Sequence, residues 1–251
     1  MSKTAIITGA SKRIGRSIAI NLAKQGYDIV VHYNRSKSDA QKLVKEIKTI
    51  GVNAFSISLD LNRTKKVKDF FYKVKKKTSN IQVLINNASL FEFDNLRKLS
   101  EKSFDNHINI NLKSPLMLSK YFVENLEHKE GSIINILDQR VSNITPYFLS
   151  YTISKVGLYT LTKNLALSLA PNIRVNAIAP GPTLKSSRQN LKQFSEQIKR
   201  TPLKQQVSLK DINDGINFLN ESKSVTGQVL YLDSGQNLGW AHTRSKKFTD
   251  D

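Results

Sequence analysis

The chain has 251 residues, a length that one α/β domain can reach without splitting into two. It contains no cysteine, which excludes a disulfide framework, a thiolate metal site and a cysteine nucleophile, and no metal site is predicted. Its 39 basic and 20 acidic residues give a formal net charge of +19. Neither a secretory signal nor an apolar run of membrane-spanning length is present, so we expect a cytoplasmic protein without a membrane partner.

A charge this positive raises the question of whether nucleic acid is a partner. The lysines are scattered along the chain, and they are not interleaved with stacking aromatic residues in an RNA-binding pattern. We interpret them as solvated helix faces, and we do not expect nucleic acid as a partner. The positive charge would still help to attract anionic cofactors and small-molecule substrates.

Strand-like and helix-like segments alternate along the chain, which predicts a parallel sheet covered on both faces. The predicted strands are Thr4–Thr8, Asp28–Tyr33, Ala54–Leu59, Gln82–Asn86, Ser132–Leu137, Arg174–Ile178 and Val229–Leu232. The predicted helices are Arg13–Gln25, Asp39–Ile50, Thr64–Lys77, Glu101–Asn125, Tyr151–Ala170 and one that begins after Ser208 with a capping box. This pattern predicts an α/β fold: a single Rossmann-type, doubly wound domain with a seven-stranded parallel sheet flanked by helices.

No internal repeat, low-complexity linker or second domain interrupts the pattern, so residues 1–240 are predicted to form one domain. Residues 183–206 are polar, lysine-rich and weakly patterned. A segment of this kind after a late strand is a candidate substrate lid. Residues 241–251 are predicted to be a loose C-terminal tail.

A glycine-containing turn, Thr8–Gly15, joins the first predicted strand to the first predicted helix. Gly9 permits the tight turn, and Gly15 allows the helix to pack closely on the strand. The free N–H groups at the start of the helix can then bind a phosphate. The position of this turn directly after an apolar strand indicates a dinucleotide site.

The end of the second predicted strand indicates which dinucleotide is bound. An NAD enzyme usually has an acidic residue there, which accepts hydrogen bonds from the ribose hydroxyls. This chain has Asn34, Arg35 and Ser36 instead, with a further arginine, Arg13, in the turn. Two guanidinium groups and a serine suit the 2′-phosphate of NADP(H), which they can bind through charge-assisted hydrogen bonds.

A second group of polar residues carries the predicted chemistry. Tyr151 and Lys155 are four residues apart on a predicted helix, so that both side chains can reach one pocket. We expect the ammonium group to lower the pKa of the phenol and to make it a better proton donor. Asn111, Asp138 and the Asn86–Ser89 segment after the fourth strand accompany this pair.

Together these residues resemble the short-chain dehydrogenase/reductase family over most of the chain, from about Lys3 to Leu238. The matching pieces are Thr8–Gly15, Asp60-Leu61, Asn86-Asn87-Ala88, Asn111, Tyr151 with Lys155, Pro180-Gly181, and Thr226-Gly227-Gln228 before Asp233. The resemblance implies that the tyrosine donates a proton, that the lysine binds the nicotinamide ribose, and that the asparagine holds a water molecule in a proton relay.

Carried over by position, the resemblance implies the catalytic residues Asn111, Asp138, Tyr151 and Lys155. Together with the turn and the arginines, it implies a cofactor site made of Gly9, Lys12, Arg13, Ile14, Asn34, Arg35, Ser36, Asp60, Leu61, Asn87, Ala88, Ser89, Tyr151, Lys155, Pro180 and Gly181. The family usually forms tetramers through the two long helices near residues 101–125 and 151–170. By analogy we expect a homo-oligomer, a tetramer.

Three departures from the usual family pattern resemble one subgroup. Arg13 replaces a middle glycine of the turn, Ser89 replaces a glycine, and Asp138 stands where most members have a catalytic serine. All three occur together in pteridine reductases, and bacterial dihydromonapterin and dihydrofolate reductases are similar. Phe91 matches the residue that stacks on the pterin there, so the implied substrate-binding residues are Ser89, Phe91, Asp138 and Tyr151.

The predicted function is therefore NADPH-dependent reduction of a pterin-like substrate, a dihydropterin or dihydrofolate. A pterin ring has both donor and acceptor nitrogens, which suits a carboxyl group such as that of Asp138. Asp138 could instead cap the loop after its strand, and Phe91 could be core packing. A carbonyl reductase for 3-oxoacyl or other keto substrates, and a noncatalytic nucleotide-binding or RNA-binding Rossmann protein, remain as alternatives.

Overall fold

The computed structural model describes residues 2–127 and 130–239, and the predicted tail at 241–251 lies outside them. The described residues contain one parallel sheet of seven strands in the order β3-β2-β1-β4-β5-β6-β7. The strands are β1 Thr4–Ile7, β2 Asp28–Tyr33, β3 Ala54–Ser58, β4 Ile81–Asn86, β5 Gly131–Ile136, β6 Ile173–Pro180 and β7 Val229–Leu232. The prediction of a doubly wound, seven-stranded parallel sheet is confirmed.

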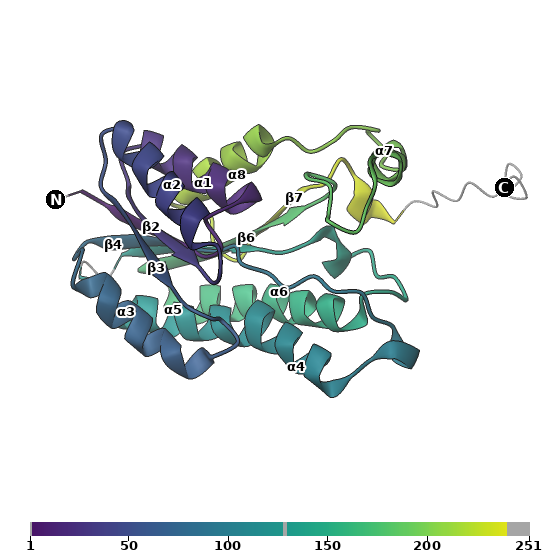
Figure 1. Cartoon of the computed structure of the whole chain (residues 1–251), viewed down its shortest axis with the longest axis horizontal. Helices are drawn as coiled ribbons and strands as arrows, with labels where there is room; N and C mark the ends of the chain where they lie inside the picture. The colour runs from purple at the N-terminus through teal and green to yellow at the C-terminus, as the bar shows by residue number, and fades with distance from the viewer. Residues whose placement is uncertain (1, 128–129, 240–251) are drawn as a thin grey trace, which may run out of the picture.

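Helices cover both faces of this sheet (Figure 1). One face carries α1 Arg13–Lys24, α2 Lys37–Thr49 and α8 Leu209–Glu221, and the other carries α3 Val67–Lys75, α4 Glu101–Ile108, α5 Ser114–Glu124 and α6 Leu149–Leu169. The short helix α7, Leu191–Lys199, lies beyond one end of the sheet. No helix of residues 2–127 and 130–239 is long and apolar enough to cross a membrane.

Neighbouring residues of the central strands supply the two halves of the core. Ile7 and Val31 pack in the cluster beneath α1, α2 and α8, whereas their neighbours Ile6 and Val30 pack in the cluster beneath α3, α5 and α6. All four side chains are fully buried. Because successive side chains of a strand point to opposite faces, a strand covered on both faces needs apolar residues throughout. This requirement explains the continuous apolar runs in the sequence.

The predicted helices differ from the structure at three places. The predicted helix Glu101–Asn125 is interrupted at Asn109–Lys113 by a π-helical turn, which is wider than an α-helical one. The predicted helix Thr64–Lys77 begins with a short 3₁₀-helix at Thr64–Lys66. Helix α7 lies inside the segment that had no clear pattern, where Asn190 caps its first turn through a reciprocal capping box. Phe194 is its buried contact.

The strand order places the site. The chain runs outward from β1 to β2 and β3, and then returns to the other side of β1 with β4. Ligands of open α/β sheets bind outside the carboxyl ends of the strands at such a switch point. The segments that follow β1 and β4 therefore lie where a ligand is expected.

Candidate active site

The predicted site residues come together at the carboxyl edge of the sheet. Each group directly follows or ends a parallel strand: the turn at 9–14 follows β1, residues 34–36 follow β2, and residues 60–61 come just after β3. Residues 87–89 follow β4, Asp138 follows β5, and Pro180 is the last residue of β6. The parallel sheet thus gathers residues that are distant in the sequence.

The glycine turn is closed tightly against the segment after β4. Gly9 has a backbone φ of +61°, a conformation that favours glycine. A Cβ added to Gly15 would lie 2.5 Å from Nδ2 of Asn87, so only glycine fits there. The same Asn87 amide donates to the carbonyl oxygen of Thr8 at 2.8 Å. The predicted roles of both glycines in the shape of the turn are consistent with these contacts.

His32, the fifth residue of β2, holds the glycine turn in place, a role that was not predicted for it. The backbone N–H of Gly9 donates to Nδ1 of His32 at 3.0 Å, so Nε2 carries the ring proton and donates to the Leu59 carbonyl at 2.9 Å. Burial lowers the pKa of His32 from 6.5 to about 4, despite the bond to Leu59. The ring is therefore neutral near pH 7, and it links the turn to the end of β3.

The basic residues around the turn have different partners. Arg35 and Asn34 are exposed after β2, whereas Lys12 forms an ion pair with Asp39 at 3.0 Å. The guanidinium of Arg13 donates instead to the carbonyl oxygens of Leu184 and Lys185, at 3.0 and 2.9 Å. Arg13 therefore connects the predicted phosphate turn to the predicted lid, a contact that the sequence did not indicate.

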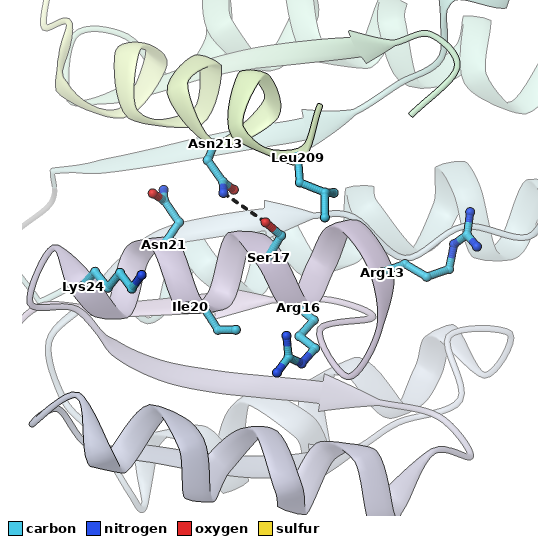
Figure 2. Close-up of a pocket in the computed structure, with 8 residues that line it drawn as sticks. All are labelled: Arg13, Arg16, Ser17, Ile20, Asn21, Lys24, Leu209 and Asn213. Atoms are coloured by element: carbon cyan, nitrogen blue, oxygen red, sulfur yellow. Dashed lines mark hydrogen bonds between the residues drawn. The ribbon is translucent and has the colours of Figure 1, made fainter. Parts of the chain in front are cut away.

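A basic groove of about 260 Å³ lies between α1 and α8 and includes Arg13 at one end. Figure 2 shows Ser17 of α1 hydrogen-bonded to Asn213 of α8 across the groove, with Arg13 extending away from this contact. Neither Tyr151 nor Asp138 lines the groove, so it is separate from the place where these two residues lie.

The remaining predicted cofactor residues shape the walls of the site. Asp60 accepts a bond from the Asn62 N–H at 3.0 Å, and Leu61 is buried beside it. The N–H of Ala88 donates to the hydroxyl of Thr8 at 2.9 Å. Gly181 approaches β7 so closely that an added Cβ would lie 2.6 Å from the Cα of Asp233. These contacts place the backbone of each segment close to its neighbour.

Tyr151, Asp138 and Lys155 form the candidate reactive centre. The Tyr151 hydroxyl donates to Oδ2 of Asp138 at 2.8 Å. The Lys155 ammonium lies 5.7 Å from the centre of the Tyr151 ring and donates to the carbonyl of Ile136 at 2.7 Å. Lys155 is only 2% exposed, although it is a cation. A phenol, a carboxylate and an ammonium group therefore meet where β5 and α6 approach each other.

The protonation of this centre differs from the sequence expectation. Burial, followed by the neighbouring charge of Asp138, raises the pKa of Tyr151 well above 10, so the expected lowering by Lys155 is wrong for this arrangement. Burial also lowers the pKa of Lys155 from 10.5 to about 8, opposed by Asp138. Tyr151 is thus held in its protonated form near neutral pH, the form that can donate a proton.

Asn111 lies in the wider turn between α4 and α5 and is completely buried. Its amide nitrogen donates to the Leu90 carbonyl and to the Ser154 hydroxyl, both at 2.9 Å. Its amide oxygen accepts from the Leu90 N–H at 2.8 Å and from the Ser89 hydroxyl at 3.3 Å. Asn111 therefore fastens the segment after β4 to α6, and the sequence did not single out Ser154.

An aromatic cluster lies beside the reactive tyrosine. The ring of Phe91 stacks on Phe148 with their centres 4.5 Å apart, and it meets Tyr151 edge-on at 4.6 Å. Phe93 meets Phe148 edge-on at 5.3 Å, and Tyr147 stacks on Phe93 at 5.9 Å. Phe91 thus contacts the candidate proton donor directly, and its role in binding substrate stays a prediction. The other three aromatic residues of the cluster were not predicted from the sequence to lie at the site.

Asp94 anchors the start of α6, the helix that carries the reactive pair. It is 2% exposed, and its carboxylate oxygens lie 3.3 and 3.2 Å from the N–H of Ser150. Its own carbonyl accepts from the N–H of Phe148 at 2.8 Å. Phe148 has a φ of +60° and supplies no side-chain cap, so Asp94 takes over that role from a distant loop.

The sheet, the glycine turn and the buried Tyr–Lys pair define a dinucleotide-binding oxidoreductase of the Rossmann class. The family model of the short chain dehydrogenases matches residues 3–196. A 3-oxoacyl-[acyl-carrier-protein] reductase, FabG, from Staphylococcus epidermidis is 34% identical over 241 residues, covering 94% of this chain and 99% of that protein. The chain belongs to the short-chain dehydrogenase family.

Two solved structures are similar over nearly the whole chain. FolM alternative dihydrofolate reductase 1 from Brucella canis, complexed with NADP, is 37% identical, covers 97% of each chain and superposes with a TM-score of 0.92. The protein of the same name from Brucella suis, also in complex with NADP, is 38% identical, covers 95% of this chain and 96% of that one, and has a TM-score of 0.92. The names of these two proteins indicate a different substrate class from that of FabG, dihydrofolate instead of a 3-oxoacyl group.

Proposed function

We propose that the protein is an NADPH-dependent reductase of a dihydropterin or dihydrofolate. The cofactor is NADP(H), and the enzyme is an oxidoreductase. The observation that carries the choice of substrate is the 2.8 Å hydrogen bond between Tyr151 and Asp138. It places a carboxylate beside the candidate proton donor, next to the flat ring of Phe91. A heterocycle with ring nitrogens and an amino group can use both the acid and the stacking surface.

The residues at the carboxyl edge of the sheet fit the proposed cofactor. Gly15 and Gly9 let the turn close against Asn87 and Ala88. The free N–H groups at the start of α1 are proposed to bind a phosphate of the cofactor. Arg35, with Asn34 and Ser36, is proposed to bind the 2′-phosphate. When bound, NADPH supplies the hydride for the reduction.

The chain's own residues supply and guide the proton. Tyr151 is proposed to donate it, because its hydroxyl is the protonated group that meets Asp138. Asp138 orients that phenol in the free protein, and in the complex it would accept a hydrogen bond from the substrate. Lys155 is proposed to bind the nicotinamide ribose. Asn111 is proposed to hold a water molecule of the proton relay, with its amide fixed by its contacts to Leu90 and Ser154.

A second candidate function is reduction of a 3-oxoacyl or other keto substrate. The specific support is the 34% identity to FabG, which extends over 94% of this chain. A ketone needs one proton at one oxygen, which Tyr151 alone could supply. Asp138 would then have no partner on the substrate, and this is why the pterin assignment is preferred.

We also propose that residues 1–240 act as one domain, with residues 183–206 as its substrate lid and a homo-oligomer, by analogy a tetramer, as the working form. The contacts of Arg13 with the carbonyls of Leu184 and Lys185 support the lid, because they join it to the cofactor turn. Leu116 on α5 and Leu167 on α6 support self-association, since they are 41% and 82% exposed on the helices that would meet.

The test of this function is NADPH oxidation, followed by the loss of its absorbance, with a panel of dihydrofolate, a dihydropterin, a quinone and a 3-oxoacyl thioester. The proposal expects the highest kcat/KM with the two pterin compounds. A higher kcat/KM with the thioester would instead select the keto-reductase function. If no compound is reduced, filter binding of RNA at two salt concentrations tests the noncatalytic alternative, because phosphate contacts give a steep salt dependence.

A further inference from the structure

We propose that Arg188 binds a negatively charged substituent of the substrate, so that the site prefers pterins with a carboxylate-bearing side chain over pterins with an uncharged one. This inference rests on the proposed function and adds to it the charge of the substrate. It depends on where Arg188 lies and on the partners that the neighbouring cations already have.

Arg188 lies on the proposed lid, two residues before the cap of α7. Its guanidinium carbon is 6.0 Å from the centre of the Phe91 ring. That ring meets the candidate proton donor Tyr151 edge-on at 4.6 Å. A cation on the lid therefore lies over the aromatic ring that borders the reactive centre.

The other cations near the centre have partners. Arg140 lies 5.0 Å from the centre of the Phe148 ring, donates to the hydroxyl of Thr145 at 3.2 Å and is 4.0 Å from Asp138. The Lys185 ammonium donates to the carbonyl of Gln189 at 2.8 Å. These groups hold the walls of the site in place, and their charges are partly satisfied within the protein.

Arg188 differs from them because its side chain is exposed and its hydrogen-bond donors are free. Among residues 2–127 and 130–239, no carboxylate forms an ion pair with it and no side-chain hydrogen bond engages it. A free guanidinium is a planar fork that binds a carboxylate through two parallel hydrogen bonds. A flat ring beside Phe91 with an attached carboxylate would satisfy the stacking surface and the cation together.

Dihydrofolate is the substrate form that this arrangement fits, because its side chain ends in carboxylates. A dihydropterin with a hydroxylated, uncharged side chain would use the ring of Phe91 but not the guanidinium. Since Arg188 is exposed, water and salt weaken its attraction for an anion. We therefore expect a contribution of about tenfold in affinity, at the lower end of what a charge-assisted pair provides.

The test measures equilibrium binding of folate and of biopterin to the NADP⁺-loaded protein by calorimetry, for wild type, Arg188→Ala and Arg200→Ala. Arg200 is the matched control, because it is an exposed arginine of the same segment at the far end of α7, a helix about 13 Å long. Arg188→Ala should weaken folate about tenfold and leave biopterin nearly unchanged, and the difference should shrink at about 0.5 M salt. Arg200→Ala should change neither affinity.

Equal weakening of folate and biopterin, or unchanged folate binding in Arg188→Ala, would overturn the assignment. A loss of NADPH affinity in that variant as large as the loss of folate affinity would assign Arg188 to the cofactor and would also overturn it. Turnover of dihydrofolate and dihydrobiopterin by wild type is measured alongside. If neither is reduced but folate binding still depends on Arg188, the proposed function fails and this inference stands; if wild type does not bind folate, the inference fails as well.

Discussion

Replacement of Lys155 by methionine should change how the stability of the protein depends on pH. Lys155 is a cation with 2% exposure, and burial lowers its pKa from 10.5 to about 8. Between those two values the unfolded chain holds the proton that the folded protein has released. Wild-type stability should therefore rise with pH across this window, as the unfavourable buried charge disappears.

The expected change in the free energy of unfolding follows from the two pKa values of Lys155, 10.5 in the unfolded chain and about 8 in the folded protein. The full effect is about 3 kcal/mol, of which about 2 kcal/mol should appear between about pH 7 and about pH 9.5. Tyr151 limits the upper end of the window, because its pKa lies well above 10 in the folded protein and stability falls again once unfolded tyrosines ionise. Methionine keeps most of the side-chain volume but cannot titrate.

The measurement is urea unfolding of the cofactor-free protein across this pH range, for wild type, Lys155→Met and Lys163→Met. Lys163 is an exposed lysine on the same helix and serves as the control. The free energy of unfolding of wild type and of Lys163→Met should rise together by about 2 kcal/mol relative to Lys155→Met. Parallel curves for all three proteins would refute the argument that the charge of Lys155 is buried at neutral pH.

Three further predictions concern the cofactor, the proton and the catalytic helix. Arg35→Asp should weaken NADPH by about one to two decades and leave NADH nearly unchanged, as measured by fluorescence titration; equal losses would place the phosphate elsewhere. Tyr151→Phe should lower kcat by about 10²- to 10⁴-fold with NADPH affinity retained, and a preserved kcat would assign the proton to Asp138 or water. Asp94→Ala should lower the unfolding free energy by about 1–2 kcal/mol and also reduce kcat. Asp94→Asn keeps an acceptor for the Ser150 N–H, so it should retain most of the stability and most of kcat. Equal losses in the two variants would argue against the helix cap.

The sheet could be predicted from the sequence because a strand that is buried on both faces is a continuous run of apolar residues. Val30 and Val31 are both buried, and a run of such residues is readable without any knowledge of the fold. Helix α7 was missed because Phe194 is its only buried residue, so that lysines and glutamines dominate its pattern. The wider turn at Asn109–Lys113 was missed because no residue type marks it, although it carries Asn111.

The candidate site was predictable to the extent that its residues directly follow strands. Asp138 was found in this way, whereas Tyr151 and Lys155 were found from their four-residue spacing on a predicted helix. The structure joins Tyr151 to Asp138 by a hydrogen bond and places the Lys155 ammonium 5.7 Å from the centre of the Tyr151 ring. The direction of the Tyr151 pKa was not predictable, because it depends on how deeply the phenol is buried and on the carboxylate that it meets. Asp94 could not be found either, since its role arises from a contact 56 residues away in sequence.

We propose that Asp138 makes this protein a pterin reductase, and the variant Asp138→Ser tests that role. The measurement is kcat/KM for dihydrofolate and for an activated ketone, in wild type and in the variant, with NADPH saturating. We expect the value for dihydrofolate to fall by about 10²-fold or more while the value for the ketone is kept or improved, because a serine hydroxyl can serve a carbonyl oxygen but cannot replace a carboxylate at a pterin. An unchanged kcat/KM for dihydrofolate in Asp138→Ser would contradict the claim.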